Sequence, residues 1–257
     1  MERQSLLYLC KDRTLFLGYL DDPLQMTQGA ATLCVSLEGK IHVILPDSNE
    51  SFYATSILIP PGFSIVMDSQ KNKVANINLD VMGADFFCLS NNMQEKSGLY
   101  VSLKNEEDII RALQEISQYK YPLNVVKSIL AGLLTTDAVH SYPLEKRVLK
   151  AVDIIQNTIE ENLSIDYLAK QVNLSVSGLT KLFKKQTGVP IRRYRQWHRL
   201  FTTATEIGKG RNITEAAQVA GFVDLPHCTH TFNMMLGMKP SYFLIRPGAL
   251  EIMVDDD

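Results

Sequence analysis

The chain has 257 residues, which is enough for two domains that each bury their own core. Hydrophobic residues make up 46% and charged residues 21%, values that are typical of globular proteins and exclude extensive disorder. The net charge of −2 hides an asymmetry. Residues 1–145 carry 11 Lys and Arg against 17 Asp and Glu, whereas residues 146–246 carry 15 against 7. A basic second half indicates contact with nucleic acid or a membrane surface.

The first third of the chain has the pattern of short strands. Apolar and polar residues alternate over 75–81 and again over 41–45. Residues 57–59 end at the strong turn signal Pro60-Pro61-Gly62, after which 63–67 resume an apolar segment. This spacing of strands and turns predicts an antiparallel barrel or sandwich.

Two helices are predicted after the strands. Asn105 is the expected N-cap of the first, whose first turn is acidic and whose apolar residues recur on one face. The second, beyond Pro122, carries an apolar stripe with helical spacing. Each stripe either covers the strands or forms a dimerisation surface, and for the second helix both interpretations stay open. The candidate dimerisation residues are Val126, Ile129, Leu130 and Leu133.

The sequence offers no convincing catalytic or metal site. His42 and His140 are the histidines of the first half, and they lie nearly a hundred residues apart. There is no Gly-rich phosphate loop, nucleophile elbow or carboxylate pair. We therefore expect no enzyme, no catalytic residues, no metal ligands and no cofactor. A metal-dependent barrel enzyme is the least supported of the alternatives.

The sequence also lacks features that would direct the protein out of the cytoplasm. The first twenty residues lack the apolar core of a signal peptide, and no apolar run is long enough to cross a bilayer. The four cysteines are scattered, with no spacing that suggests zinc or disulfides. We expect a cytoplasmic protein with reduced thiols and no membrane contact.

A polar, proline-broken segment at 139–145 predicts a linker between two domains, at 1–138 and 146–250. After a helix expected over about 144–160, one pattern occurs twice, at 168–190 and again at 216–240. Ala169 matches Ala217, and Phe183 matches Phe232. Self-similarity of this kind indicates one structural unit used twice.

Each copy has the pattern of a helix-turn-helix. In the first, Ser164 is expected to cap a short helix, Asn173 falls at a turn that favours positive φ, and Ser175 is expected to cap a second helix. The outer face of that second helix can lie in a major groove, with its early residues on base edges and its lysines near phosphates. Its predicted DNA-binding residues are Ser177, Thr180, Lys181, Lys184 and Lys185.

A long helix is predicted from Ile191 to about Gly208, between the two copies. Its length of ~27 Å approaches the ~34 Å between successive major grooves on one side of a duplex. Four arginines on this helix are expected to meet the DNA backbone, with Arg192 and Arg193 as the named contacts.

At this point the chain resembles the AraC/XylS family of bacterial transcription regulators. The residues that carry the resemblance are Leu168, Ala169, Asn173, Leu174, Ser175, Leu179, Leu182, Phe183, Lys184, Lys185, Gly188, Tyr194 and Arg199, then Ile213, Ala217, Gly221, Phe222, Asp224, Phe232, Gly237, Lys239, Pro240 and Ser241. The strand-rich front half, with Ile59-Pro60-Pro61-Gly62, also looks like the cupin-type sensor domain common in this family.

The resemblance implies an α+β fold: a cupin-like antiparallel β-barrel with two helices, then an all-α domain with two helix-turn-helix units joined by a long helix. It implies a promoter-binding regulator, usually an activator that contacts RNA polymerase. It also implies a front domain that binds a small effector in its barrel, forms a homodimer, or both. By the family's docking mode, the second unit reads DNA through Pro226, Thr229 and His230, and Asn233 is a further predicted contact.

The two units differ in charge. Residues 164–200 carry 8 Lys and Arg against 1 acidic residue, whereas residues 211–246 carry 3 against 2. Because phosphate neutralisation supplies much of the affinity for DNA, we expect the first unit to dominate. The alternative function is a protein–protein adaptor that acts on RNA polymerase or another regulator with little DNA affinity.

Overall fold

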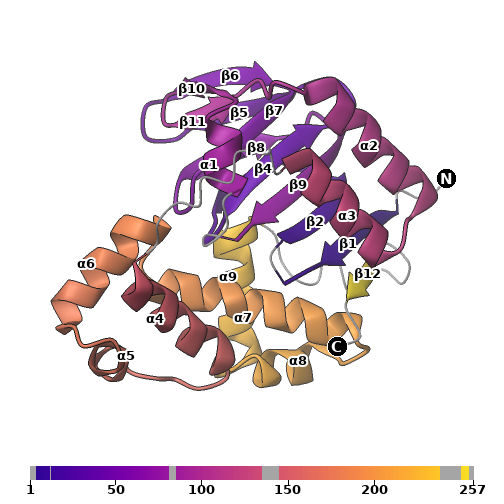
Figure 1. The fold of residues 1–257 in the computed structure, drawn as a ribbon. Helices are drawn as coiled ribbons and strands as arrows, with labels where there is room; N and C mark the ends of the chain where they lie inside the picture. Colours follow the sequence, from indigo (N-terminus) through magenta and orange to yellow (C-terminus); the bar gives the residue numbers. More distant parts are fainter. Residues whose placement is uncertain (1–3, 12, 81–84, 135–144, 238–249, 255–257) are drawn as a thin grey trace.

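The computed structural model of the protein describes residues 4–11, 13–80, 85–134, 145–237 and 250–254. Strands and the helices α1–α3 form a front domain, and the helices α4–α9 form a second domain beneath it (Figure 1). The predicted α+β class, with a strand-rich first half and a helical second half, is therefore confirmed. Most of the predicted linker lies outside the described residues.

The described strands of the front domain form two sheets. The larger has the strand order β10 (Gln94–Lys96), β11 (Leu99–Val101), β7 (Ser56–Ile59), β4 (Ala31–Ser36), β9 (Lys73–Leu79), β2 (Arg13–Tyr19), β1 (Ser5–Leu9) and β12 (Leu250–Val254). The smaller has the order β3 (Leu24–Thr27), β8 (Ser64–Asp68), β5 (Ile41–Leu45) and β6 (Glu50–Ala54).

Strand β9 lies between β2 and β4, and its alternating side chains face two environments. Ala75, Ile77 and Leu79 pack in a cluster with the helices α2 (Glu106–Tyr119) and α3 (Leu123–Leu134). On the other face, Val74 packs in a second cluster with residues of the four-stranded sheet. Asn76 and Asn78 share that second face, because side chains two residues apart point to the same side of a strand. The predicted strand is thus present as Lys73–Leu79, and both of its faces are covered, whereas the predicted end at Val81 lies outside the described residues.

The two sheets do not close into a barrel, so the predicted cupin-like β-barrel is wrong in its closure. They pack face to face over a shared apolar cluster instead. At the edge of the smaller sheet, β3 packs against helix α9 (Leu225–Leu236) rather than pairing with a strand of the larger sheet. The larger sheet ends in β12, which pairs in parallel with β1, so the sheet is not purely antiparallel.

The predicted dimerisation stripe on α3 lies largely inside the front domain. Val126 and Leu130 are fully buried in the cluster under the eight-stranded sheet, and Ile129 and Leu133 are partly buried against the same cluster. A side chain that packs in its own core cannot also present a surface to a second copy. The stripe therefore covers the sheet, and the dimerisation reading is wrong for Val126 and Leu130.

The other two helices of the front domain, α1 and α2, begin in different ways. Helix α2 begins at Glu106 as predicted, but the Asn105 side chain forms no capping hydrogen bond. Helix α1 (Asp85–Ser90) begins at a buried carboxylate that accepts a hydrogen bond from Arg13 Nε at 2.6 Å. This ion pair joins the start of α1 to strand β2.

The helical domain has two apolar clusters that meet along one long helix. Its elements are α4 (Lys146–Asn157), α5 (Ile165–Gln171), α6 (Val176–Thr187), α7 (Ile191–Gly208), α8 (Ile213–Val219) and α9. Helices α4, α5 and α6 share a core with the start of α7, which contributes Ile191 and Tyr194. Helices α8 and α9 share a second core with Leu200, farther along α7. Helix α7 thus links two compact helix pairs, as the sequence predicts.

The two domains contact each other along α7 and α9. Arg193 Nη1 donates a hydrogen bond to the carbonyl oxygen of Thr27, 3.3 Å away. At the end of α9, a Cβ built on Gly237 would lie 2.8 Å from the carbonyl oxygen of Gln25, so only glycine fits against β3. Strand β12 also packs on α7, where Val254 and Ile252 lie against Gly208.

Candidate nucleic-acid interface and interdomain cavity

The first helix pair, α5 and α6, has the caps and the turn that its sequence predicts. Ser164 accepts a hydrogen bond from the Tyr167 amide, and Ser175 accepts one from the Gly178 amide. Asn173 adopts φ 52° at the turn between the helices. Asparagine tolerates this left-handed conformation better than most side chains do. The caps and the turn fix the angle at which α6 leaves α5.

The outer face of α6 is polar and basic. Ser177, Lys181, Lys184 and Lys185 are exposed, whereas Leu179 and Phe183 anchor the opposite face in the core. Thr180 is half-buried, and its hydroxyl donates a hydrogen bond to the carbonyl oxygen of Val176 at 2.7 Å. The residues predicted to bind DNA in this helix therefore share one accessible face, with the lysines toward its carboxyl end.

The arginines of α7 are not equivalent, and the expectation that all four meet DNA is wrong. Arg199 is 5% exposed and donates hydrogen bonds to the carbonyl oxygens of Ile159 and Glu161 and to Asn162 Oδ1. Arg195 donates to the carbonyl oxygen of Leu163. These two side chains hold the loop after α4 in place.

The two arginines that were named as DNA contacts also differ. Arg192 is exposed, as a phosphate contact requires. Arg193 is half-buried and hydrogen-bonded to Thr27 in the front domain. In this arrangement the guanidinium of Arg193 stabilises the contact between the domains.

The second helix pair, α8 and α9, repeats the geometry of the first with different residues. Asn212 caps α8 by accepting from the Glu215 amide, and Asp224 caps α9 by accepting from the His227 amide at 2.7 Å. At the turn, Gly221 has φ 81°, and a Cβ there would lie 2.7 Å from the backbone of Glu160. Glycine is needed at this turn for close approach to the first unit as well as for its φ angle.

The outer face of α9 is accessible but nearly uncharged. Pro226, His230 and Asn233 are exposed and Thr229 is half-buried, so the four predicted contacts lie on the open side of the helix. Cys228 and Phe232 are buried on the other side. The described part of this unit therefore offers hydrogen-bonding side chains for base edges and few cations for phosphates.

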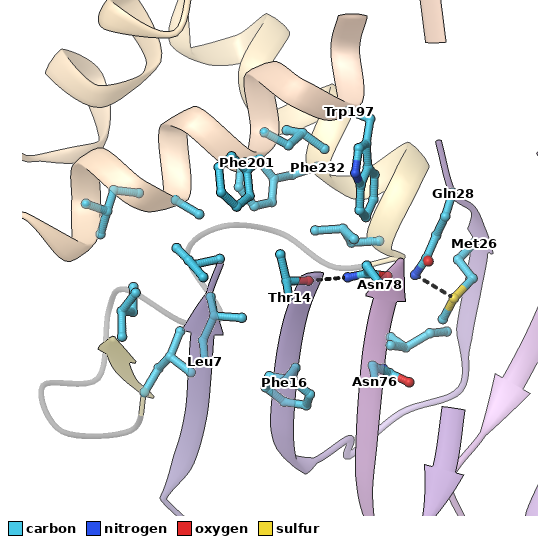
Figure 2. Close-up of a pocket in the computed structure, with 18 residues that line it drawn as sticks. Leu7, Thr14, Phe16, Met26, Gln28, Asn76, Asn78, Trp197, Phe201 and Phe232 are labelled. Atoms are coloured by element: carbon cyan, nitrogen blue, oxygen red, sulfur yellow. Dashed lines mark hydrogen bonds between the residues drawn. The ribbon is translucent and has the colours of Figure 1, made fainter. Parts of the chain in front are cut away.

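A cavity of about 130 Å³ lies between the front domain and the helices α7 and α9 (Figure 2). Sequence reasoning did not find it, because its walls come from both halves of the chain. Its lining is mainly apolar, and none of the described residues that line it is charged. They are Leu7, Leu9, Thr14, Phe16, Leu24, Met26, Gln28, Asn76, Asn78, Trp197, Leu200, Phe201, Ala204, Ile207, Phe232, Leu236, Leu250 and Ile252.

Most polar groups of this cavity are joined by hydrogen bonds. Asn78 Nδ2 donates to Thr14 Oγ1 at 2.8 Å, and Asn78 Oδ1 accepts from Thr32 Oγ1 at 2.8 Å. The Thr32 hydroxyl also contacts Gln28 Oε1, and Gln28 Nε2 donates to the thioether of Met26 at 3.3 Å. This chain crosses β2, β9 and β4 and satisfies the Asn78 amide.

Asn76 is the exception. The residue is 91% buried, and its Oδ1 accepts no hydrogen bond from the described residues. Figure 2 shows Asn76 beside Phe16, away from Trp197 and Phe201. A buried amide without a partner costs roughly 1–3 kcal/mol, so it signals a missing partner at this end of the cavity.

A smaller cavity adjoins the first and contains titratable groups. It shares Thr14, Asn78, Trp197 and Phe201 with the larger cavity and is also lined by Lys11, Arg13, Asp80 and His198. The His198 ring lies 4.5 Å from the Tyr194 ring, and burial lowers the pKa of His198 to about 4. This histidine is therefore neutral near neutral pH.

Neither a metal site nor a membrane-spanning helix is present among the residues that the structure describes. No group of three or more His, Cys, Asp or Glu side chains there is placed to hold a metal ion. Within the same residues, none of the helices is both long and apolar enough to span a membrane.

Comparison with known proteins bears on both domains. Residues 168–246 match a family model described as a helix-turn-helix domain. The match begins within α5 and extends over α6, α7, α8 and α9. No curated protein matches the chain by sequence.

The fold of the whole chain is similar to that of ToxT from Vibrio cholerae, with a TM-score of 0.59 and 16% identity over 91% of this chain and 98% of that one. A structure of ToxT from the same organism bound to an unsaturated fatty acid aligns with a TM-score of 0.59 and 14% identity, over 92% and 96%. A ToxT structure bound to (E)-4-(8-methylnaphthalen-1-yl)but-3-enoic acid aligns with a TM-score of 0.58 and 14% identity. The alignment covers 95% of this chain and 99% of that one.

The helical domain and its capped helix pairs define a helix-turn-helix protein of the DNA-binding class. The family model places residues 168–246 in a helix-turn-helix domain, which agrees with the resemblance of the sequence to AraC/XylS regulators.

Proposed function

We propose that this regulator binds promoter DNA with both helix pairs, so that α6 and α9 enter adjacent major grooves on one side of the duplex. The observation that carries the proposal is the open face of α6, where Ser177, Lys181, Lys184 and Lys185 are all exposed. Helix α7 has 18 residues and is therefore ~27 Å long, which approaches the ~34 Å between successive grooves.

The two helix pairs contribute differently in this proposal. The first supplies most of the affinity, because residues 164–200 carry 8 basic side chains against 1 acidic. The second discriminates between sequences through Thr229, His230 and Asn233, whose polar atoms can meet base edges. Arg192 contacts a phosphate, and Arg193 does so only if its bond to Thr27 opens.

We also propose that the interdomain cavity binds a small effector. Support comes from its walls, which combine β1, β2 and β9 of the front domain with α7 and α9. A molecule there changes the packing of Phe232 and Leu236, which lie on the inner side of the second recognition helix. ToxT, which is similar in fold, has been determined with a fatty acid and with a naphthyl-containing acid bound, and this supports the proposal.

The remaining parts of the proposal follow the family. The protein acts in the cytoplasm as an activator that contacts RNA polymerase, and it works as a homodimer. The dimer surface lies elsewhere than on the buried residues Val126 and Leu130.

The test uses DNA sites selected by the purified protein from random duplexes. At a fixed salt concentration, Lys181→Ala is expected to weaken binding to the selected site by ~1–3 kcal/mol, because Lys181 reaches a base or an adjacent phosphate. His230→Ala is expected to cost clearly less. A larger loss for His230→Ala contradicts the dominance of the first pair, and equal affinity for selected and random DNA contradicts specific reading.

A second candidate function is that of a protein–protein adaptor. It is favoured by the second helix pair, where Val223 is 76% exposed and the outer face is nearly uncharged. The adaptor acts on RNA polymerase or another regulator through α8 and α9. Binding to purified RNA polymerase together with no measurable DNA affinity at low salt would support this function over the first.

A further inference from the structure

We propose that the ligand of the interdomain cavity is an uncharged, mainly apolar molecule with one group that both donates and accepts hydrogen bonds, such as a primary amide or a hydroxyl. This inference rests on the proposed effector cavity and specifies its ligand class. It separates this chain from the two ToxT complexes, whose ligands are carboxylic acids by their descriptions.

The first argument is the Asn76 carboxamide. Its oxygen is buried and has no hydrogen-bond partner among the described residues. A ligand that only accepts, such as an ionised carboxylate, can satisfy the nitrogen alone. An amide or a hydroxyl can satisfy both atoms. That conclusion also holds if the Asn76 amide is rotated by half a turn, because oxygen and nitrogen merely exchange places.

The second argument is the charge of the lining. The described residues that line the cavity itself include no cation that could neutralise a buried carboxylate, whereas Lys11 and Arg13 line the smaller cavity beside it. Gln28 Nε2 donates only to the Met26 thioether, a weak acceptor, so it is a further neutral donor for a ligand. Burial of an ion without a counter-ion is strongly unfavourable, whereas a neutral polar group needs only hydrogen bonds.

The third argument is the size of the cavity and the direction in which a ligand would extend within it. A cavity of about 130 Å³ has room for roughly ten non-hydrogen atoms, at 10–15 Å³ for each probe-sized group. With its polar group at Asn76, the ligand extends past Phe16 toward Trp197 and Phe201 (Figure 2). These aromatic walls suit an alkyl chain of about eight carbons.

Trp197 makes the inference measurable in the intact protein, because it is the one tryptophan of the sequence and it lines the cavity. The emission of Trp197 is followed while the full chain is titrated with octanamide, 1-octanol or octanoate near neutral pH. We expect octanamide and 1-octanol to bind at least tenfold more tightly than octanoate. Octanoate binding as tightly as octanamide overturns the inference but leaves the effector cavity intact.

Two variants of β9 form the matched pair. Asn76→Leu is expected to weaken octanamide binding roughly tenfold while the thermal midpoint without ligand stays equal or rises, since the buried Asn76 oxygen has no hydrogen bond to lose among the described residues. Asn78→Leu is expected to lower the midpoint of thermal unfolding, because it removes the hydrogen bonds to Thr14 and Thr32. Unchanged octanamide affinity in Asn76→Leu overturns the assignment of Asn76.

Two further outcomes separate the inference from the function on which it rests. If octanoate binds tightly and Lys11→Met abolishes that binding, the ligand is an anion that reaches the smaller cavity, and the inference is overturned. If none of the three compounds changes Trp197 emission or the thermal midpoint, this ligand class is wrong. Blocking the cavity with Ala204→Phe then decides the effector proposal itself: unchanged DNA binding in that variant argues against any effector there.

Discussion

Gly29 of the front domain lies directly against Trp197 of helix α7, so closely that a Cβ built on Gly29 would be 2.6 Å from the Trp197 Cβ. The neighbouring backbone oxygen of Arg193 would be 3.2 Å away. Neither atom can move without moving α7 itself. The relative position of the two domains therefore depends on the absence of a side chain at residue 29.

This contact predicts that Gly29→Ala separates the domains locally. We expect a loss of about 1–3 kcal/mol in the free energy of unfolding, typical of overpacking, and a shift in Trp197 emission. The matched control is Gly132→Ala in α3, where a Cβ meets nothing within 4 Å. There the same substitution should be neutral or stabilise by up to ~1 kcal/mol, because alanine favours helix. Equal stabilities for the two variants would contradict this picture of the interface.

The arginines of α7 supply a second matched pair. Arg199→Leu is expected to lower the free energy of unfolding by on the order of 3 kcal/mol, because it leaves the acceptors of Ile159, Glu161 and Asn162 without their donor. Arg192→Leu should leave stability within ~0.5 kcal/mol, as is usual for an exposed site. In DNA-binding titrations, Arg192→Leu should instead reduce the salt dependence. A stable Arg199→Leu protein would refute the structural role of that residue.

His198 predicts a pH dependence of stability. Its pKa is lowered by burial to about 4 in the folded protein, from 6.5 in the unfolded chain. Between these values the unfolded state binds a proton that the folded state does not, so the free energy of unfolding falls as the pH decreases through this window. The loss should reach on the order of 3 kcal/mol near pH 4.

Urea unfolding across this pH range is the measurement for His198. The His198→Phe variant keeps a ring beside Tyr194 and removes the titrating group, so the difference between the two proteins isolates the contribution of His198. Parallel pH profiles for wild type and variant would show that the histidine is not held neutral by the fold.

The lysines at the end of α6 predict a salt effect on DNA binding. Lys184→Gln and Lys185→Gln should each reduce the slope of log affinity against log salt by roughly one, without changing the preferred sequence. Lys71→Gln is the control, since Lys71 is exposed in a front-domain turn and the charge change is the same. Slopes that fall equally in all three variants would point to net charge rather than to phosphate contacts.

The helical domain could be predicted well from the sequence because its signals are local. Ser164 and Ser175 are caps, and Asn173 has the predicted positive φ. Each depends on residues within one or two turns of helix, so the sequence contains the whole interaction. The burial of Arg199 was missed, since its partners lie about 40 residues away along the chain.

The front domain was predicted less completely because its arrangement depends on distant contacts. The strands were found, but whether they close into a barrel is decided by what covers β3, and α9 covers it. The buried stripe on α3 fits either a sheet or a second copy, so periodicity alone left both open. Asn76 and Asn78 were read as the polar half of an alternating strand, yet their face meets the helical domain rather than water.

The parallel pairing of β12 with β1 changes how the chain can be divided. The chain leaves the front domain after α3, forms the helical domain, and returns to contribute an edge strand in which Ser5 lies opposite Leu250. In topological terms the helical domain is an insertion into the front domain, tethered at both of its ends. A fragment that stops after α3 lacks part of its own sheet, and a fragment of the helices alone ends in a strand without a partner. Folding, ligand binding and DNA binding should therefore be measured on the undivided chain.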